Sequence, residues 1–96
     1  ELGDDAQALK VGKRALAIFE RVLPANSPEV AGVFNNLGAI QVSLGAIVEA
    51  LQYFEESLDI YRKILPSNHP NLVKLEKNIQ CVIRMQKQTE GDASIQ

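Results

Sequence analysis

One offset relates almost the whole chain to itself, because residues 42 positions apart are repeatedly identical. Leu2 and Gly3 recur as Leu44 and Gly45 (44 − 2 = 42), and the register runs without a gap to about residue 88. A fixed period of this length is typical of repeat proteins, in which each repeat is one supersecondary unit stacked on its neighbour. The period therefore predicts a stacked array. Further identical pairs are Ala8 and Ala50, Leu9 and Leu51, Leu23 and Leu65, Pro24 and Pro66, and Asn36 and Asn78.

Within each period the apolar residues indicate helices and no strand. In the segments 28–44 and 46–65, apolar side chains recur at steps of three and four, which places them along one face of a helix. Pro28 and Pro70 stand where the first helical turn tolerates proline, and His69 is expected as a turn or cap residue before the second of them. The sequence therefore predicts helices over about residues 4–23, 28–44, 46–65 and 70–88.

These predicted helices are of two alternating kinds. The period relates the helix at 4–23 to that at 46–65, and the helix at 28–44 to that at 70–88. The chain thus begins and ends half-way through two-helix repeats, and we interpret it as a fragment of a longer array. The predicted fold class is all-α, an α-solenoid of antiparallel helix pairs. The polar segment 89–96 lacks a periodic apolar face and is expected to be a disordered tail.

Composition argues against several classes of partner and chemistry. Lys and Arg total 10 against 12 Asp and Glu, so the net charge of −2 gives no overall attraction to nucleic acid or to an anionic membrane. Because Cys81 is the only cysteine and His69 the only histidine, we expect no metal site, no cofactor and no enzymatic activity. The absence of an apolar run long enough for a signal peptide or membrane span predicts a cytoplasmic location.

The arrangement of small and aromatic residues resembles the tetratricopeptide repeat, whose paired helices nest against one another. Gly38, Ala50 and Phe54 fall at the spacing of that motif's glycine, alanine and aromatic positions. The repeat from 35 to 70 is similar to the longer kinesin light chain type, since an ordinary tetratricopeptide period is about 34 residues. The resemblance implies that extended or helical peptide segments bind on the concave surface formed by the first helix of each repeat.

Three positions depart from the pattern of this family, and at the first of them, Gln41, an aromatic residue is usual. Gly12 stands where Phe54 stands one period later, and Gln80 stands where Gly38 stands one period earlier. A glycine at the latter position permits close approach of the neighbouring helix. Gln80 therefore indicates that the helix at 70–88 is a cap, because terminal repeats need a more polar outer face.

The resemblance also implies which side chains face a ligand. Asn36 and Asn78 occupy equivalent positions, and each amide offers a donor and an acceptor to a peptide backbone. Lys74, Lys77 and Arg84 share a face with Asn78 and suit an acidic segment or a terminal carboxylate. The predicted peptide-binding residues are Asn35, Asn36, Lys74, Lys77, Asn78 and Arg84, and Gly32, Ala39, Val42, Ser43, Cys81 and Met85 complete the inward stripes.

Each of these assignments has a structural alternative. Asn36 and Asn78 can instead hydrogen-bond within or between helices and hold the repeat interface together. The basic residues of the last helix can form a solvated face on a cap. Asparagine costs roughly half a kcal/mol in a helix relative to alanine, and either role offsets that cost.

Three functions are compatible with this sequence. The first is a scaffold module that binds a protein or an acidic peptide segment within a larger adaptor or signalling protein. The second is structural self-assembly, in which the half-repeats at both ends stack end to end because a solenoid unit buries its apolar side only against neighbours. The third is regulation of a nucleotide-driven switch, whose nucleotide site would lie outside this sequence.

Overall fold

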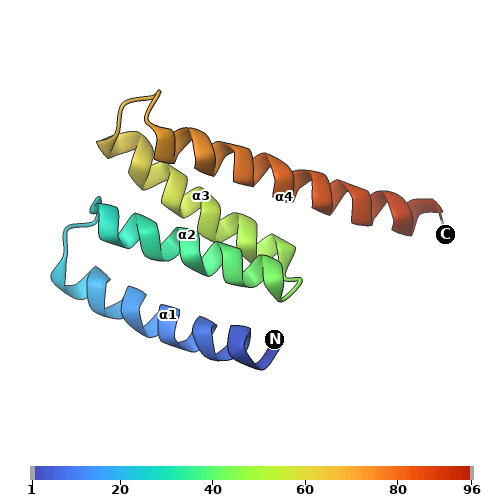
Figure 1. Ribbon diagram of the computed structural model, residues 1–96, viewed down its shortest axis with the longest axis horizontal. Coiled ribbons are helices and arrows are strands. Elements are labelled where there is room, and N and C mark those ends of the chain that lie inside the picture. Colours follow the sequence, from blue (N-terminus) through green and yellow to red (C-terminus); the bar gives the residue numbers. More distant parts are fainter. Residues whose placement is uncertain (1, 96) are drawn as a thin grey trace.

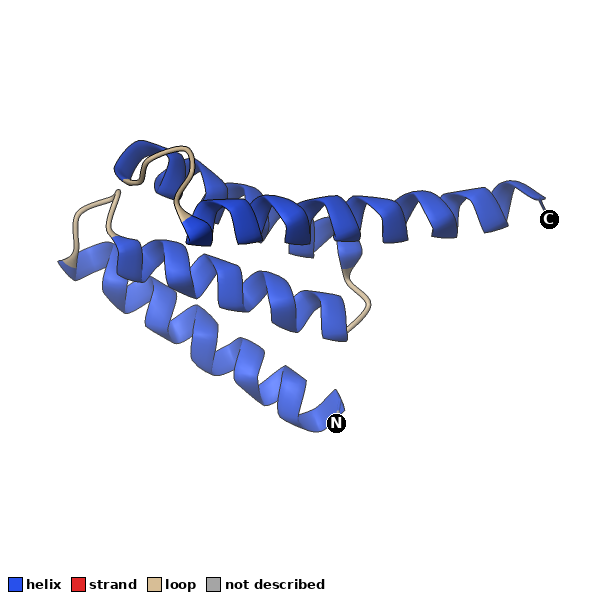
Figure 2. Cartoon of the chain, turned by 45° about the horizontal axis from the view of Figure 1, so that its top comes forward, coloured by secondary structure: helices blue, strands red, loops and turns tan. Residues whose placement is uncertain are grey.

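The computed structural model describes the backbone of residues 2–95 and the side chains of residues 3–88. Within that range the chain is helical apart from short connections between the helices (Figure 2). The helices are α1 (Leu2–Val22), α2 (Pro28–Ser43), α3 (Ile47–Ile64) and α4 (Pro70–Ile95). The all-α prediction is confirmed, and both prolines predicted to begin a helix do so.

Local chemistry explains where the helices begin. Ser27 caps α2, because its Oγ accepts the backbone N–H of Val30 at 3.4 Å. His69 has the expected role before α4, where its Nδ1 accepts the backbone N–H of Asn71 at 3.1 Å. Gly45 takes a φ of 80° between α2 and α3, a left-handed conformation that glycine adopts without steric cost.

The end of α4 differs from the prediction. The helix was expected to end near residue 88, and its backbone continues to Ile95. No proline follows residue 88, and Gly91 costs only about 1 kcal/mol inside a helix. The predicted boundary is therefore wrong, since loss of the apolar face does not by itself end a helix. The predicted disorder of the tail falls on residues whose side chains lie outside the described part of the chain.

The helices follow one another across the molecule, with α1 and α4 on opposite sides (Figure 1). α2 packs against α1 and α3, and α4 packs against α3. The overall extents are 48 × 34 × 17 Å, so the thinnest dimension is less than two helix diameters of about 10 Å. In a closed four-helix bundle α1 and α4 would be neighbours. The open arrangement is instead that of a solenoid.

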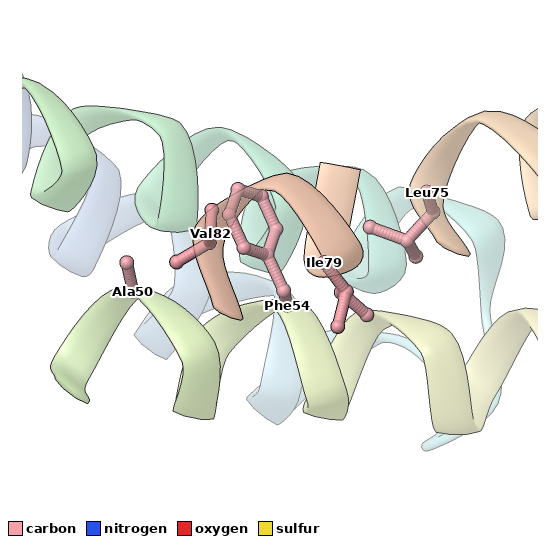
Figure 3. Packing of buried hydrophobic residues seen from close by; sticks show 5 residues of the cluster. All are labelled: Ala50, Phe54, Leu75, Ile79 and Val82. Atoms are coloured by element: carbon pink, nitrogen blue, oxygen red, sulfur yellow. The ribbon is translucent and has the colours of Figure 1, made fainter. Parts of the chain in front are cut away.

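Two apolar clusters hold the helices together. One lies between α3 and α4, where Phe54 reaches toward Val82 and Ile79 (Figure 3). The other lies between α2 and α3, where Ile60 packs against Val30. Half-buried residues of α1 join the edge of the second cluster. The buried members are Ala50, Phe54, Leu75, Ile79 and Val82 in the first cluster and Val30, Ala31, Phe34 and Ile60 in the second.

Small residues let α2 and α3 approach closely. A Cβ atom at Gly38 would lie 2.7 Å from ring carbons of Phe54, so the ring occupies the space that a side chain would fill. The fully buried Ser57 donates its hydroxyl to the carbonyl oxygen of Ala31 at 2.7 Å. The close approach predicted at Gly38 is confirmed.

Candidate functional site

An open hollow of about 300 Å³ lies where α2 and α4 present their equivalent faces. These two helices are one period apart, because Pro28 and Pro70 begin them (70 − 28 = 42). Phe54 of α3 and Val82 of α4 also line the hollow. Their side chains approach one another in Figure 3. We call this hollow the α2–α4 groove. Its other lining residues are Ala39, Val42, Asn78, Cys81 and Met85.

The α2–α4 groove combines an apolar lining with a single amide. Ala39 and Val42 contribute apolar surface from α2, and the 42% exposed Met85 contributes a flexible thioether from α4. Asn78 is half-buried and supplies both a donor and an acceptor. Concave, mostly apolar sites with a few polar groups are typical of ligand binding. The groove is therefore suited to apolar side chains of a peptide and to one backbone hydrogen bond.

The two equivalent asparagines have different surroundings. Asn78 lines the α2–α4 groove, whereas Asn36 is exposed on α2 and is not among the lining residues. Asn35 is half-buried on α2. Among the described side chains, neither Asn36 nor Asn78 makes a hydrogen bond to a neighbouring helix. The alternative in which these amides hold the repeat interface together thus has no contact to support it.

The predicted basic residues of α4 do not line the α2–α4 groove. Lys77 and Arg84 line a second open hollow of about 520 Å³, on a face of α4 that no other described helix covers. Asn78 lies in the groove instead, and Lys74 is exposed and lines neither hollow. Cys81 lies at the border and lines both. Of the predicted binding residues on α4, Asn78 thus lines the groove, while Lys77 and Arg84 line the adjoining hollow. The remaining lining residues of the second hollow are Val73, Glu76 and Gln80.

The sequence identified part of this site and missed another part. The inward stripes predicted from the register contain all the lining residues of the α2–α4 groove except Phe54 and Val82. Phe54 and Val82 were not predicted as site residues, because their apolar pattern is that of core positions. A signal for Phe54 was the glycine at position 38, which makes space for the ring that lines the groove.

The described residues contain no group of three histidine, cysteine or acidic side chains placed to hold a metal ion. No described helix combines the length and the apolar character needed to cross a bilayer.

The fold and the groove define a helical repeat protein with an open hollow between equivalent helix faces. A family model for the tetratricopeptide repeat matches residues 1–63, and the chain belongs to that family. Repeats of this family generally mediate protein–protein interactions and are typically not catalytic. A comparison with curated proteins finds no match.

Proposed function

We propose that this chain is a peptide-binding scaffold module of the kinesin light chain type, acting within a larger adaptor or signalling protein. The 42-residue period supports that type, because it exceeds the ordinary period of about 34 residues by about eight (42 − 34 = 8). The partner segment lies in the α2–α4 groove. We place binding in the cytoplasm, where the exposed thiol of Cys81 stays reduced.

The observation that carries this proposal is the groove itself. Equivalent faces of two first helices form a hollow of about 300 Å³ with a mostly apolar lining, as a site for alternating peptide side chains requires. Asn78 stands at this hollow without a hydrogen-bond partner among the described side chains. Its amide can donate a hydrogen bond to a peptide carbonyl or accept one from a peptide N–H.

An acidic partner segment is favoured by the charges of α4. Lys74, Lys77 and Arg84 form no ion pair within the described residues, whereas Glu76 is paired with Arg62 at 3.2 Å. The basic side chains thus remain available beside the groove and along the adjoining face. Acidic residues that flank the apolar anchors of a peptide would raise the association rate more than the affinity.

Peptides selected from a random displayed library test this function. We expect the enriched peptide to bind the full chain and to lose at least tenfold in affinity for Ala39→Trp, because the indole fills the groove. Asn78→Ala should weaken binding by about two- to tenfold, the effect of one hydrogen bond worth about 0.5 to 1.5 kcal/mol. Fluorescence anisotropy of the labelled peptide measures both.

The matched control for the filled groove is Ala17→Trp, which adds the same indole at an exposed alanine on α1. It should leave affinity unchanged. Combining Asn36→Ala and Lys77→Ala with Asn78→Ala tests the wider predicted site. Peptides that bind Ala39→Trp and the triple variant as well as the original chain would place the binding surface elsewhere.

A further inference from the structure

A third hollow, of about 310 Å³, lies where α1, α2 and α3 meet. It shares no lining residue with the α2–α4 groove or with the hollow of about 520 Å³ on α4. We call it the α1–α3 hollow. Its base is apolar, because the buried residues Val30, Phe34 and Ile60 line it.

The exposed residues that line the α1–α3 hollow carry a net negative charge. Glu20 of α1 and Glu56 of α3 are exposed and form no ion pair among the described residues. Asp59 is paired with Lys63 at 3.8 Å, a long contact between two exposed side chains. Three carboxylates and one ammonium group give a local charge of −2 (1 − 3 = −2). The hollow therefore attracts a cation.

The exposure of Glu20 does not come from the position of α1 in the chain. Glu20 corresponds to Arg62 of α3 (20 + 42 = 62), a helix that packs against both α2 and α4. The side chain of Arg62 is nevertheless 59% exposed. A helix packed on α1 in the way that α2 packs on α3 would thus leave Glu20 open.

An equivalent crossing of helices in the same molecule indicates which cation fits. One period after Glu20 and Phe34 stand Arg62 and Glu76 (20 + 42 = 62, 34 + 42 = 76). There the guanidinium of Arg62 bonds the carboxylate of Glu76 at 3.2 Å. At the same two positions in the α1–α2 crossing stand a carboxylate and an aromatic ring, and neither is cationic. A guanidinium from another molecule would supply the opposite charge.

The lining favours an organic cation over a metal ion. The described residues contain no three acidic side chains placed to hold one metal ion, so these carboxylates cannot share one. A long basic side chain can instead lay its methylene groups on the apolar base and direct its charge to the carboxylates. A guanidinium suits this best, because its five N–H donors reach carboxylates on two helices and its flat face packs on an aromatic ring.

We propose that the α1–α3 hollow binds an arginine side chain of a partner protein. The stem of the arginine lies on Phe34 and Ile60, and its guanidinium bonds Glu20 and Glu56. The volume of about 310 Å³ is at the lower end for ligand sites and suits one long side chain. This site goes beyond the proposed peptide binding, because it uses other residues and takes a ligand of the opposite charge.

Nuclear magnetic resonance of the isotope-labelled full chain tests the proposal, with Nα-acetyl-arginine amide as the probe. We expect saturable shifts of the backbone amide signals around Glu20, Phe34 and Glu56, with a Kd of about 1 mM for a ligand of this size. The citrulline analogue has a similar shape without the charge, and the guanidinium ion has the charge without the stem. Each should bind about tenfold more weakly than the arginine probe.

Two variants of the hollow sharpen the test. Glu56→Gln removes one carboxylate and should weaken binding of the arginine probe by about three- to tenfold. Glu20→Arg should weaken it by about tenfold or more, because it places a guanidinium of the chain itself where Arg62 stands one period later. Both are measured in about 0.15 M salt, which screens charges outside the hollow.

The matched controls are Glu55→Gln and Glu55→Arg. Glu55 is exposed on α3 next to Glu56 and does not line the hollow. Each control makes the same change in net charge as one of the two variants. Both controls should bind the arginine probe as the original chain does.

Several results would overturn the proposal. Equal binding of the citrulline analogue would mean that the hollow accepts stems without regard to charge, and equal binding of guanidinium that it accepts any small cation. Equal weakening by Glu55→Gln and Glu56→Gln would mean that net charge alone attracts the probe. Shifts confined to other residues, or none up to about 20 mM, would exclude the site. Each result leaves peptide binding in the α2–α4 groove untouched, because Glu20 and Glu56 do not line it.

Discussion

α1 and α3 occupy equivalent places in the repeat and have very different surroundings. α3 lies between α2 and α4 and contributes the buried residues Ala50, Phe54, Ser57 and Ile60. α1 packs mainly against α2, and none of its described side chains is buried. The period determines which residues are equivalent, whereas the number of neighbouring helices determines which of them stabilise the fold.

The sharpest test of this comparison substitutes the same residue at equivalent positions. Ile60→Ala should lower the free energy of unfolding by about 2 to 5 kcal/mol, because Ile60 is only 8% exposed and its loss leaves a cavity. Ile18→Ala should change it by about 0.5 kcal/mol or less, since the side chain is 57% exposed. Urea unfolding followed by circular dichroism measures both.

Equal losses for the two isoleucines would contradict the comparison. They would mean that Ile18 is covered in solution. A smaller loss for Ile60→Ala alone would mean that α2 and α3 close around the cavity.

A second pair of substitutions compares the two glycines that meet a neighbouring helix. Gly38→Ala should destabilise by about 1 to 3 kcal/mol, because its Cβ would lie 2.7 Å from two ring carbons of the buried Phe54. Gly12→Ala should be neutral or stabilising. Its Cβ meets only the terminal methyl of Leu37, so a shift of that one buried side chain is offset by the roughly 1 kcal/mol that alanine gains over glycine in a helix.

Urea midpoints of the two alanine variants give the comparison directly. Gly32→Ala is the matched control, since no atom lies within 4 Å of a Cβ at that helical position. It should be stabilising by about the propensity difference alone. A destabilised Gly12→Ala would show that α1 packs on α2 as tightly as α3 does.

Much of the fold follows from the sequence because the residues that start helices and form turns act locally. Pro28, Pro70 and Gly45 set helix starts and a turn through their own backbone preferences, and the 42-residue period arranges the helices in order. The end of α4 was missed because residues 89–95 contain no local signal strong enough to stop a helix. Local chemistry therefore predicts beginnings better than endings here.

The candidate site was predictable only in part. Register alone identified Asn78 and Cys81 as inward residues, because equivalent positions of first helices face the same side. It did not reveal that Lys77 and Arg84 line the adjoining hollow instead of the groove. That division depends on how α4 is rotated against α3, which the packing of Val82 on Phe54 sets, and no single helix carries that information.

The smallest effect concerns one hydrogen bond that α3 makes and α1 lacks. Ser57→Ala removes the 2.7 Å bond to the carbonyl oxygen of Ala31 and should cost about 1 kcal/mol, lowering the urea midpoint by roughly 0.3 to 1 M. The cost stays small because a carbonyl inside a helix keeps its backbone bond. Ser43→Ala, at an exposed serine in α2, should change the midpoint little. An equal change of the urea midpoint in both variants would mean that the hydrogen bond of Ser57 does not contribute to the difference in stability between α3 and α1.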